Sequence, residues 1–338
     1  MNDVSRRIRE KARELFATGR IDAFLGYEPG SLPLRARPCL IQAGDEDRER
    51  RVGGLVWDSF CANNLAVFLP KLFEQDPGAR GKAQAPKPRL GMVVKGCDLR
   101  SVTALVREKQ APRGNLLLIG VPCAGMVDTG AVEERLAGDE VLSASEGEGG
   151  KLLVRARDGR ELTLFREEVL QACCRECRFP GPEAVDLLIE GPSRKPAEGV
   201  YERIRAFEAR TAEERWEAFR REIGKCIRCG ACRQACPTCY CKECFAEQTD
   251  PRWIGAGTEL SDAMIFHLVR IFHQAGRCVE CDACLRACPM GVDLRTFRGK
   301  IVKEVEELFH YLPGFSLEEA PPLSTFKEGD GEGFITEP

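Results

Sequence analysis

Two stretches of the sequence repeat a cysteine spacing that is typical of proteins holding cubane iron–sulfur clusters. Both read C-x2-C-x2-C-x3-C-P, with Cys226, Cys229, Cys232 and Cys236 in the first and Cys278, Cys281, Cys284 and Cys288 in the second. In this arrangement three closely spaced cysteines wrap one cubane and the fourth reaches the other cluster. We therefore expect one [4Fe–4S] cluster on Cys226, Cys229, Cys232 and Cys288, and a second on Cys278, Cys281, Cys284 and Cys236. Zinc sites would leave the fourth cysteine of each stretch unexplained.

Three further cysteines come directly after the first stretch. Cys239, Cys241 and Cys244 form a C-x-C-x2-C run, and Pro237 disfavours a helix immediately before it. The run suits a further metal site, of iron or of zinc, and the candidates for a distant fourth ligand are Cys39, Cys61 and Cys173. The alternatives are that these thiols pack as small apolar side chains or exchange roles with a neighbouring ligand.

A third, less local set of cysteines lies upstream. Cys97 and Cys123 each follow a predicted strand, so they would stand at the same edge of a sheet if the two strands are parallel. Cys174 and Cys177 form a C-x2-C pair after a predicted hairpin and could complete a square of four ligands. Any one of the four could instead be an inert buried thiol.

The order of motifs around these upstream cysteines resembles a known family. KGCDLRSVTAL, LLLIGVPCAGM and CCRECRFPGPEAVDLLIEGP are similar to motifs in the catalytic domain that the beta subunits of deazaflavin (coenzyme F420)-reducing hydrogenase and deazaflavin-dependent formate dehydrogenase share. The likeness covers roughly residues 50–192, with Asp186 and Gly191 at matching places. It implies a third cubane on Cys97, Cys123, Cys174 and Cys177, with FAD beside it exchanging a hydride with the deazaflavin.

Two features depart from that family. Its ferredoxin segment usually precedes this domain, whereas here it follows, and no glycine-rich phosphate loop marks a flavin site independently of the resemblance. Lys95 and Arg100 flank the Cys97 turn and are candidates to bind a phosphate or an anionic coenzyme, with a solvated surface role as the alternative. His267 and His273 are six residues apart and are expected to pack rather than to bind metal.

The elements that must position these residues divide between two domains. Apolar runs at 21–27, 53–57, 89–94 and 115–121 and the run AVDLLI predict strands, Asp158–Gly159 predicts a hairpin, and helices are expected at 5–18, 59–75 and 99–110. We therefore expect an α/β N-terminal domain with a mixed sheet, followed by a helical and loop-rich domain like a bacterial dicluster ferredoxin. The predicted boundaries are 1–192 for the first domain, 193–224 for a helical linker, 225–310 for the dicluster domain and 311–338 for an extended tail.

Composition limits the cellular compartment and the class of partner. The chain has 338 residues and 18 cysteines, its N-terminal residues are charged throughout, and no run approaches the roughly 18 apolar residues of a membrane span. We expect a cytoplasmic protein, because thiols there stay reduced and are available to bind metal. The net charge of -3 comes from 50 basic and 53 acidic residues that are interspersed, which argues against nucleic acid as a partner.

These observations predict an iron–sulfur electron-transfer subunit of an anaerobic multi-subunit oxidoreductase. Its partner would be a catalytic subunit of hydrogenase, formate dehydrogenase or heterodisulfide-reductase type, because nothing in the chain resembles a bimetallic or molybdopterin site. If FAD is bound, the chain would itself act as a deazaflavin or NAD(P) oxidoreductase; a soluble ferredoxin is a further candidate acceptor. The alternative is a flavin-free relay and adaptor subunit without catalysis of its own. The sequence assigns no catalytic acid or base.

Overall fold

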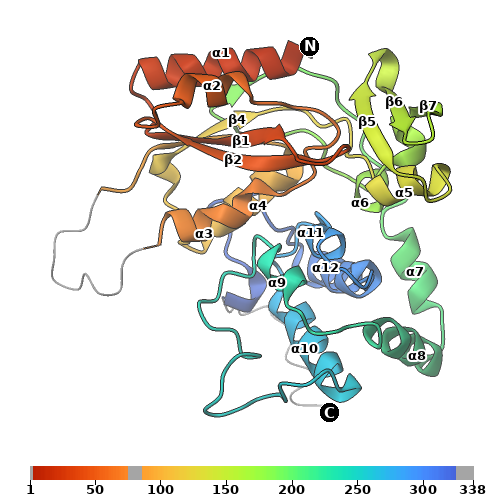
Figure 1. Ribbon diagram of the computed structural model, residues 1–338. Coiled ribbons are helices and arrows are strands. Elements are labelled where there is room, and N and C mark those ends of the chain that lie inside the picture. Colours follow the sequence, from red (N-terminus) through yellow and green to blue (C-terminus); the bar gives the residue numbers. More distant parts are fainter. Residues whose placement is uncertain (1–2, 75–85, 325–338) are drawn as a thin grey trace. The chain divides into compact units, whose positions relative to one another are not determined.

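The computed structural model describes residues 3–74 and 86–324, which fall into two compact units. The first lies within Met1–Leu99 and Ala111–Val200, and the second within Arg100–Gln110 and Tyr201–Pro338. The first is an α/β unit with a mixed sheet, and the second consists of helices and cysteine-rich loops (Figure 1). The predicted fold class is therefore confirmed.

A five-stranded sheet forms the centre of the first unit, in the order β2-β1-β3-β4-β8. Its strands are β1 (Ala23–Pro29), β2 (Ala36–Gln42), β3 (Leu90–Val94), β4 (Leu116–Gly120) and β8 (Leu187–Leu188). Only the edge pair of β1 and β2 is antiparallel; β1, β3, β4 and β8 run parallel. β3 and β4 are buried almost throughout, as expected for parallel strands covered on both faces.

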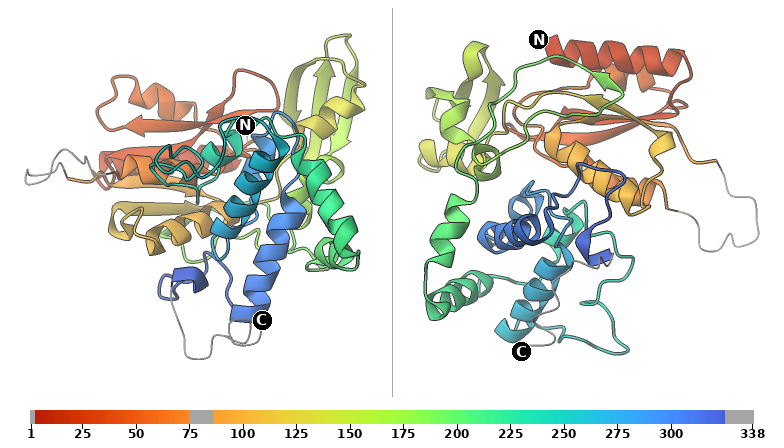
Figure 2. Two further views of the ribbon diagram at one scale, coloured as in Figure 1. Left: turned by 90° about the horizontal axis from the view of Figure 1, so that it is seen from below. Right: turned by 180° about the vertical axis from the view of Figure 1, so that it is seen from behind.

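α1 (Asp3–Ala17) covers one face of this sheet and buries an apolar stripe of Ile8, Ala12 and Leu15 (Figures 1 and 2). α4 (Gly96–Arg107) follows β3; it begins in the first unit and ends in the second. Shorter helices of the first unit are α2 (Arg48–Gly53), α3 (Leu69–Leu72), α5 (Thr129–Arg135) and α6 (Ala172–Arg175).

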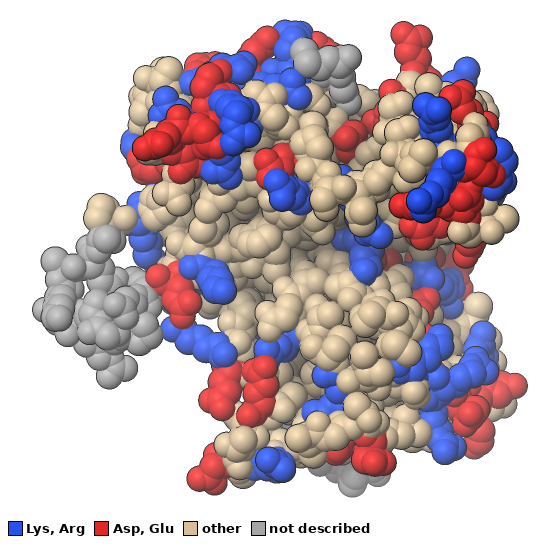
Figure 3. All heavy atoms as spheres, in the orientation of Figure 1, with Lys and Arg blue, Asp and Glu red and all other residues tan. Residues whose placement is uncertain are grey.

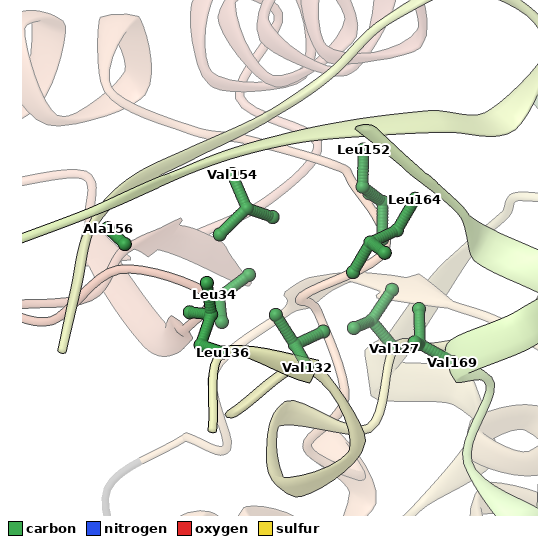
Figure 4. Packing of buried hydrophobic residues seen from close by; sticks show 9 residues of the cluster. All are labelled: Leu34, Val127, Val132, Leu136, Leu152, Val154, Ala156, Leu164 and Val169. Carbon is green, nitrogen blue, oxygen red and sulfur yellow. The ribbon is translucent and has the colours of Figure 1, made fainter. Parts of the chain in front are cut away.

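A second, three-stranded sheet packs beside α5 and has its own core. β5 (Val141–Glu146), β6 (Lys151–Ala156) and β7 (Glu161–Phe165) are antiparallel neighbours, and the predicted hairpin turn lies between β6 and β7. Figure 4 shows the side chains that fill the space beneath this sheet: Leu34, Val127, Val132, Leu136, Leu152, Val154, Ala156, Leu164 and Val169. This core holds in place the segment that leads from β7 to the Cys174–Cys177 pair.

The segment between β2 and β3 is less regular than its sequence predicts. Residues 54–57, within a predicted strand, form an irregular connection after α2, and the helix predicted over 59–75 is reduced to a 3-10 turn at Leu65–Phe68 and the single turn of α3. Side chains compete for the backbone here: the Asp58 carboxylate accepts a hydrogen bond from Phe60 N (2.9 Å), and Asn64 Oδ1 accepts one from Ala66 N (3.1 Å). Residue 75 lies outside the described residues.

The second unit is built from helices around two cysteine loops. Its helices are α7 (Glu202–Glu208), α8 (Ala212–Ile223), α9 (Ala231–Gln234), α10 (Leu260–His273), α11 (Ala283–Arg286) and α12 (Arg295–Phe309). α8, which begins at the predicted Thr211–Glu214 capping box, packs on α10, and α10 lies beside α12 (light blue and blue in Figure 2). The predicted linker, 193–224, thus contains two helices that contribute to this unit.

The surface carries no dominant charge. Figure 3 shows basic and acidic side chains interspersed over the face in view, in keeping with a net charge of -3. None of the helices within residues 3–74 and 86–324 is long and apolar enough to cross a membrane. The tail predicted over 311–338 is described only to residue 324, and within that stretch Arg107 Nε donates to the carbonyl of Glu319 (3.1 Å).

Gly96, at the first turn of α4, is required by close backbone packing. A Cβ added there would lie 2.1 Å from the carbonyl oxygen of Phe179, so the backbone would have to move. We predict that Gly96→Ala destabilises the protein by roughly 1–3 kcal/mol, the usual cost of overpacking. Urea unfolding followed by circular dichroism would measure the change. Gly44→Ala, where the added Cβ meets nothing within 4 Å, is the matched control; equal stability of the two variants would contradict the prediction.

Candidate iron-sulfur centres

The two cysteine loops of the second unit follow the same backbone course. The residue two places after the first cysteine has a positive φ in both loops, +52° at Arg228 and +58° at Glu280, and so has the residue four places after it, +74° at Gly230 and +51° at Asp282. A short helix, α9 or α11, then follows. Positive φ is uncommon outside glycine, so its repetition at matching places indicates one loop geometry used twice.

The first loop lines a cavity together with two cysteines of the second loop. Cys226, Cys229, Cys232 and Cys288 all line it, and Cys284 also reaches its wall. Two backbone N–H groups donate to sulfurs there, Arg228 N to Cys226 Sγ and Val292 N to Cys288 Sγ, both at 3.3 Å. Hydrogen bonds to sulfur are characteristic of iron–sulfur sites. The cysteines that the spacing predicts for the first cluster are therefore brought together around one cavity.

His267 also lines this cavity, which sequence reasoning missed. Its Nε2 lies 3.2 Å from Cys226 Sγ, and burial, followed by the charges of Arg270 and Arg298, lowers the pKa of His267 to about 3. The imidazole is therefore neutral and can donate one hydrogen bond to the cysteine sulfur. The apolar periodicity of α10 gives no signal for this role, because a packed histidine would produce the same pattern. His273 instead lies exposed, edge-on to Phe245.

Cysteines of the predicted second cluster gather in a deeper place. Cys236, Cys278 and Cys284 are all buried, and the charge of Cys236 acts on the pKa of both other thiols. Burial raises the pKa of Cys284 to about 11, and the pKa of Cys278 is also raised for that reason. Burial therefore disfavours free thiolates at Cys278 and Cys284, and the negative charge of a thiolate there needs compensation. Cys281, the fourth predicted ligand, is partly exposed.

Cys239, Cys241 and Cys244 are not gathered into one site. Gln274 Nε2 donates to Cys239 Sγ (3.4 Å) in the interior, Cys241 is exposed, and Cys244 lies beside Arg233. Within residues 3–74 and 86–324, no three histidine, cysteine or acidic side chains are placed to hold a single metal ion. Metal binding by this run stays a prediction. Of the three candidate fourth ligands, Cys39 lies beside Arg51, Cys61 beside Asp58 and Cys173 beside Gln171.

In the first unit, the sheet register brings two upstream cysteines to the same edge. Val94 on β3 pairs with Gly120 on β4, and Cys97 and Cys123 each lie three residues beyond. Gly125 N donates to Cys123 Sγ (3.4 Å) and Met126 N to Cys174 Sγ (3.3 Å). Burial, and next the charge of Cys174, raises the pKa of Cys123 to about 12, and Cys177 adds to the effect.

Asp186, which the resemblance singles out, has a structural place in the same unit. Its carboxylate accepts hydrogen bonds from Leu118 N (2.7 Å) and from the Arg113 guanidinium (2.8 Å). These bonds fix the chain just before β8 against β4. The run AVDLLI therefore supplies a short edge strand of two residues rather than a full buried strand.

Lys95 and Arg100, the predicted cofactor contacts, both make internal bonds. Lys95 Nζ is buried and donates at 2.8 Å to Tyr27 Oη, to Asn63 O and to the Asp98 carboxylate. Arg100, in the second unit, donates to the carbonyls of Pro313 (3.1 Å) and Val279 (3.4 Å). The three bonds of Lys95 account for all of its protons. Cofactor binding by either residue stays a prediction.

The buried Lys95–Asp98 pair makes a testable contribution to stability. Lys95→Met would leave the fully buried Asp98 carboxylate without its cation, and we predict a loss of about 3–5 kcal/mol in the free energy of unfolding. Combining Lys95→Met with Asp98→Asn removes both charges and should recover part of this loss. Urea unfolding of the single and double variants measures both quantities. A single variant as stable as the wild type would show that the pair is not needed for folding.

Comparison with known proteins agrees with this picture. The family model described as a 4Fe-4S dicluster domain matches residues 222–292. The F420-dependent formate dehydrogenase subunit beta of Methanocaldococcus jannaschii is 22% identical over 291 residues, covering 70% of this chain and 76% of that protein. The F420-dependent formate dehydrogenase 1 subunit beta of Methanococcus maripaludis is 23% identical over 367 residues, covering 91% of this chain and 90% of that protein.

A third relative matches only a short part of the chain. The probable glycolate oxidase iron-sulfur subunit of Bacillus subtilis is 32% identical over 99 residues, which is 29% of this chain and 21% of that protein. The predicted resemblance to deazaflavin-dependent beta subunits and the predicted pair of [4Fe–4S] clusters are thereby confirmed. The chain is a homologue of the beta subunits of F420-dependent formate dehydrogenases, and its C-terminal part carries a 4Fe-4S dicluster domain.

Proposed function

We propose that this chain is the iron–sulfur electron-transfer subunit of a cytoplasmic, anaerobic oxidoreductase complex, and that it passes electrons between a catalytic partner subunit and a soluble acceptor. The observation that carries the proposal is the cavity lined by Cys226, Cys229, Cys232 and Cys288, which come from two loops that are far apart in the sequence. Such crossed provision of ligands is what two adjacent cubanes require.

The residues of the second unit fit two [4Fe–4S] clusters. Cys226, Cys229, Cys232 and Cys288 would hold the first, and Cys278, Cys281, Cys284 and Cys236 the second. Each bound cluster supplies a site that takes up and gives back one electron at a time. The protein's own part is to provide the thiolates, to donate hydrogen bonds to their sulfurs from Arg228 N, Val292 N and His267, and to exclude water.

The first cluster site is the more open of the two. Cys229 is exposed, and Ile227 and Met290, which also line the cavity, are 48% and 45% exposed. By contrast, Cys236, Cys278 and Cys284 are buried. Electron transfer needs close approach of the two redox groups, so we propose that an electron carrier outside this unit exchanges electrons at the first site.

A third centre in the first unit is part of the proposal. Cys97, Cys123, Cys174 and Cys177 would hold it, as the resemblance implies, and two observations support the assignment. Parallel register carries Cys97 and Cys123 to one edge of the sheet, and backbone N–H groups donate to the sulfurs of Cys123 and Cys174. FAD next to this centre would supply conversion between single electrons and a hydride.

The partner and the acceptor follow from the relatives. Both long matches are named as subunits of F420-dependent formate dehydrogenase and come from methanogens. We therefore propose a formate-dehydrogenase-type or hydrogenase-type catalytic subunit as the partner and a deazaflavin as the soluble acceptor. A flavin-free relay is the second candidate, favoured by the match to an iron–sulfur subunit of a probable glycolate oxidase. Reduction of coenzyme F420 by the isolated, anaerobically purified chain with a chemical electron donor would distinguish the two.

The crossed ligand set predicts the outcome of removing one cysteine. Cys288→Ala should remove one low-potential EPR signal and about four irons while a second signal survives, because this residue lies on the second loop but serves the first cluster. Cys39→Ala, which removes a buried cysteine of β2 outside every proposed cluster, is the control and should keep its iron. Loss of neither signal in Cys288→Ala would contradict the crossed assignment.

The third centre has a separate prediction. Cys177→Ala should lower the iron content by about four while both EPR signals of the dicluster domain remain, because its proposed cluster lies in the other unit. Iron and acid-labile sulfide analysis, together with flavin extraction from the same samples, gives the result. An unchanged iron content would refute a cluster at this place, and stoichiometric FAD in the wild type would favour the enzyme over the relay.

A further inference from the structure

Two buried arginines lie beside ligands of the proposed clusters and have no acidic partner among the described residues. Arg298, on α12, is 8% exposed, and its Nη1 lies 2.6 Å from Cys284 Sγ. Arg270, on α10, is 3% exposed and donates through Nη2 to the carbonyl of Cys232 (2.7 Å). Within the part of the chain that the structure describes, neither guanidinium is within ion-pairing distance of a carboxylate.

Their remaining nitrogens are also unsatisfied. Nε and Nη2 of Arg298, and Nε and Nη1 of Arg270, are buried without a hydrogen-bond partner among the described residues. A buried guanidinium without a carboxylate partner and with two of its three nitrogens unsatisfied is costly, and a nearby anion would compensate it. A [4Fe–4S] centre with four thiolates is such an anion, and its negative charge increases on reduction.

The charge of Arg298 acts on the second ligand set, whereas that of Arg270 acts on both sets. Arg298 acts on Cys236, Cys278 and Cys284. Arg270 acts on Cys236 and Cys284 of the second set and on Cys232 of the first. Asp282 lies between the ligands Cys281 and Cys284 of the same loop. Its carboxylate is 4.0 Å from the Arg295 guanidinium. Asp282 is not within ion-pairing distance of Arg270 or Arg298, so neither buried arginine is neutralised by it.

The surroundings of the first ligand set differ. Arg228, the cation that lines its cavity, donates to the carbonyls of Gly255 (2.5 Å) and Gly257 (2.8 Å) and lies 3.8 Å from the Asp262 carboxylate. Its charge is therefore compensated. The polar side chain that contacts Cys226 is the neutral His267. Arg270 also reaches the first site, through Cys232, but Arg298 contacts a sulfur of the second set directly. The second site therefore receives more uncompensated positive charge than the first.

We propose that Arg298 gives the cluster on Cys236, Cys278, Cys281 and Cys284 a higher reduction potential than the cluster on Cys226, Cys229, Cys232 and Cys288, and that Arg270, which acts on both clusters, adds less to this difference. The inference rests on the proposed ligand sets. Positive charge stabilises the more negative, reduced state, and the effect is large where water is excluded. An electron that enters at the open first site is therefore transferred to the second cluster. The buried positive charge acts by stabilising the reduced state of that cluster.

The test is an EPR-monitored redox titration of the full-length chain, purified and reconstituted anaerobically. Cys288→Ala identifies the signal of the first cluster, because it removes that signal and leaves the other. In the wild type, the surviving signal should have the higher midpoint potential. Arg298→Met should lower this potential enough to change the ratio of oxidised to reduced cluster at least tenfold at fixed ambient potential, about 59 mV for one electron.

Two matched variants separate charge from packing. Arg298→Lys keeps the positive charge and should stay close to the wild-type potential. Lys303→Gln removes another buried cation of the same helix, one that pairs with Glu307 (2.7 Å), and it should move the potential much less. If Arg298→Met does not retain the second cluster, Arg270→Met is titrated in the same way and should lower the potential by a smaller amount.

Defined results would overturn the inference. A lower potential for the second cluster in the wild type does so without any arginine variant. So does an unchanged potential in a variant that keeps both signals and its full iron content. Failure of the underlying ligand assignment looks different, because Cys288→Ala would then retain both signals whatever their potentials.

Discussion

The fold of the second unit depends on the need to bring four sulfurs around each of two anionic clusters. A single loop can present three cysteines to one cluster, and the fourth must come from elsewhere. The two loops adopt the same backbone course, with positive φ at Arg228 and Glu280, and in the proposed ligand sets each loop provides one cysteine to the other site. Helices α8 and α10 then supply an apolar core that includes Phe219 and Ile271, and Val292 of the second loop packs into it.

Buried charged side chains have different partners in the two units. In the first, Lys95 is matched by Asp98 and by two further oxygen acceptors, so all donors of the ammonium group have partners within the protein. In the second, Arg270 and Arg298 are left incomplete, with donors that point to no protein acceptor. The contrast separates a structural ion pair from a site whose counter-charge comes from a bound group.

The sequence predicted the kind of cofactor better than it predicted the side chains that surround the cysteines. Cysteine spacing identified the dicluster domain, because the spacing is itself the geometric requirement, and strand order placed Cys97 and Cys123 at one sheet edge. Apolar periodicity could not foresee that Asp58 and Asn64 would break the helix predicted over 59–75, since their side chains bind backbone groups locally. Nor could it single out His267 or Arg298, because helical periodicity alone leaves open which groups the side chains contact.

The crossed loops also change how the chain is connected. With Cys236 and Cys278 on one proposed cluster, and Cys232 and Cys288 on the other, the residues between the loops form a ring closed by iron–sulfur bonds rather than by peptide bonds alone. A protease cut within residues 245–258 would then leave two fragments that migrate as one particle under native conditions. Only a chelator that extracts the iron would let them separate, so the metal would serve as a removable cross-link in the covalent topology of this unit.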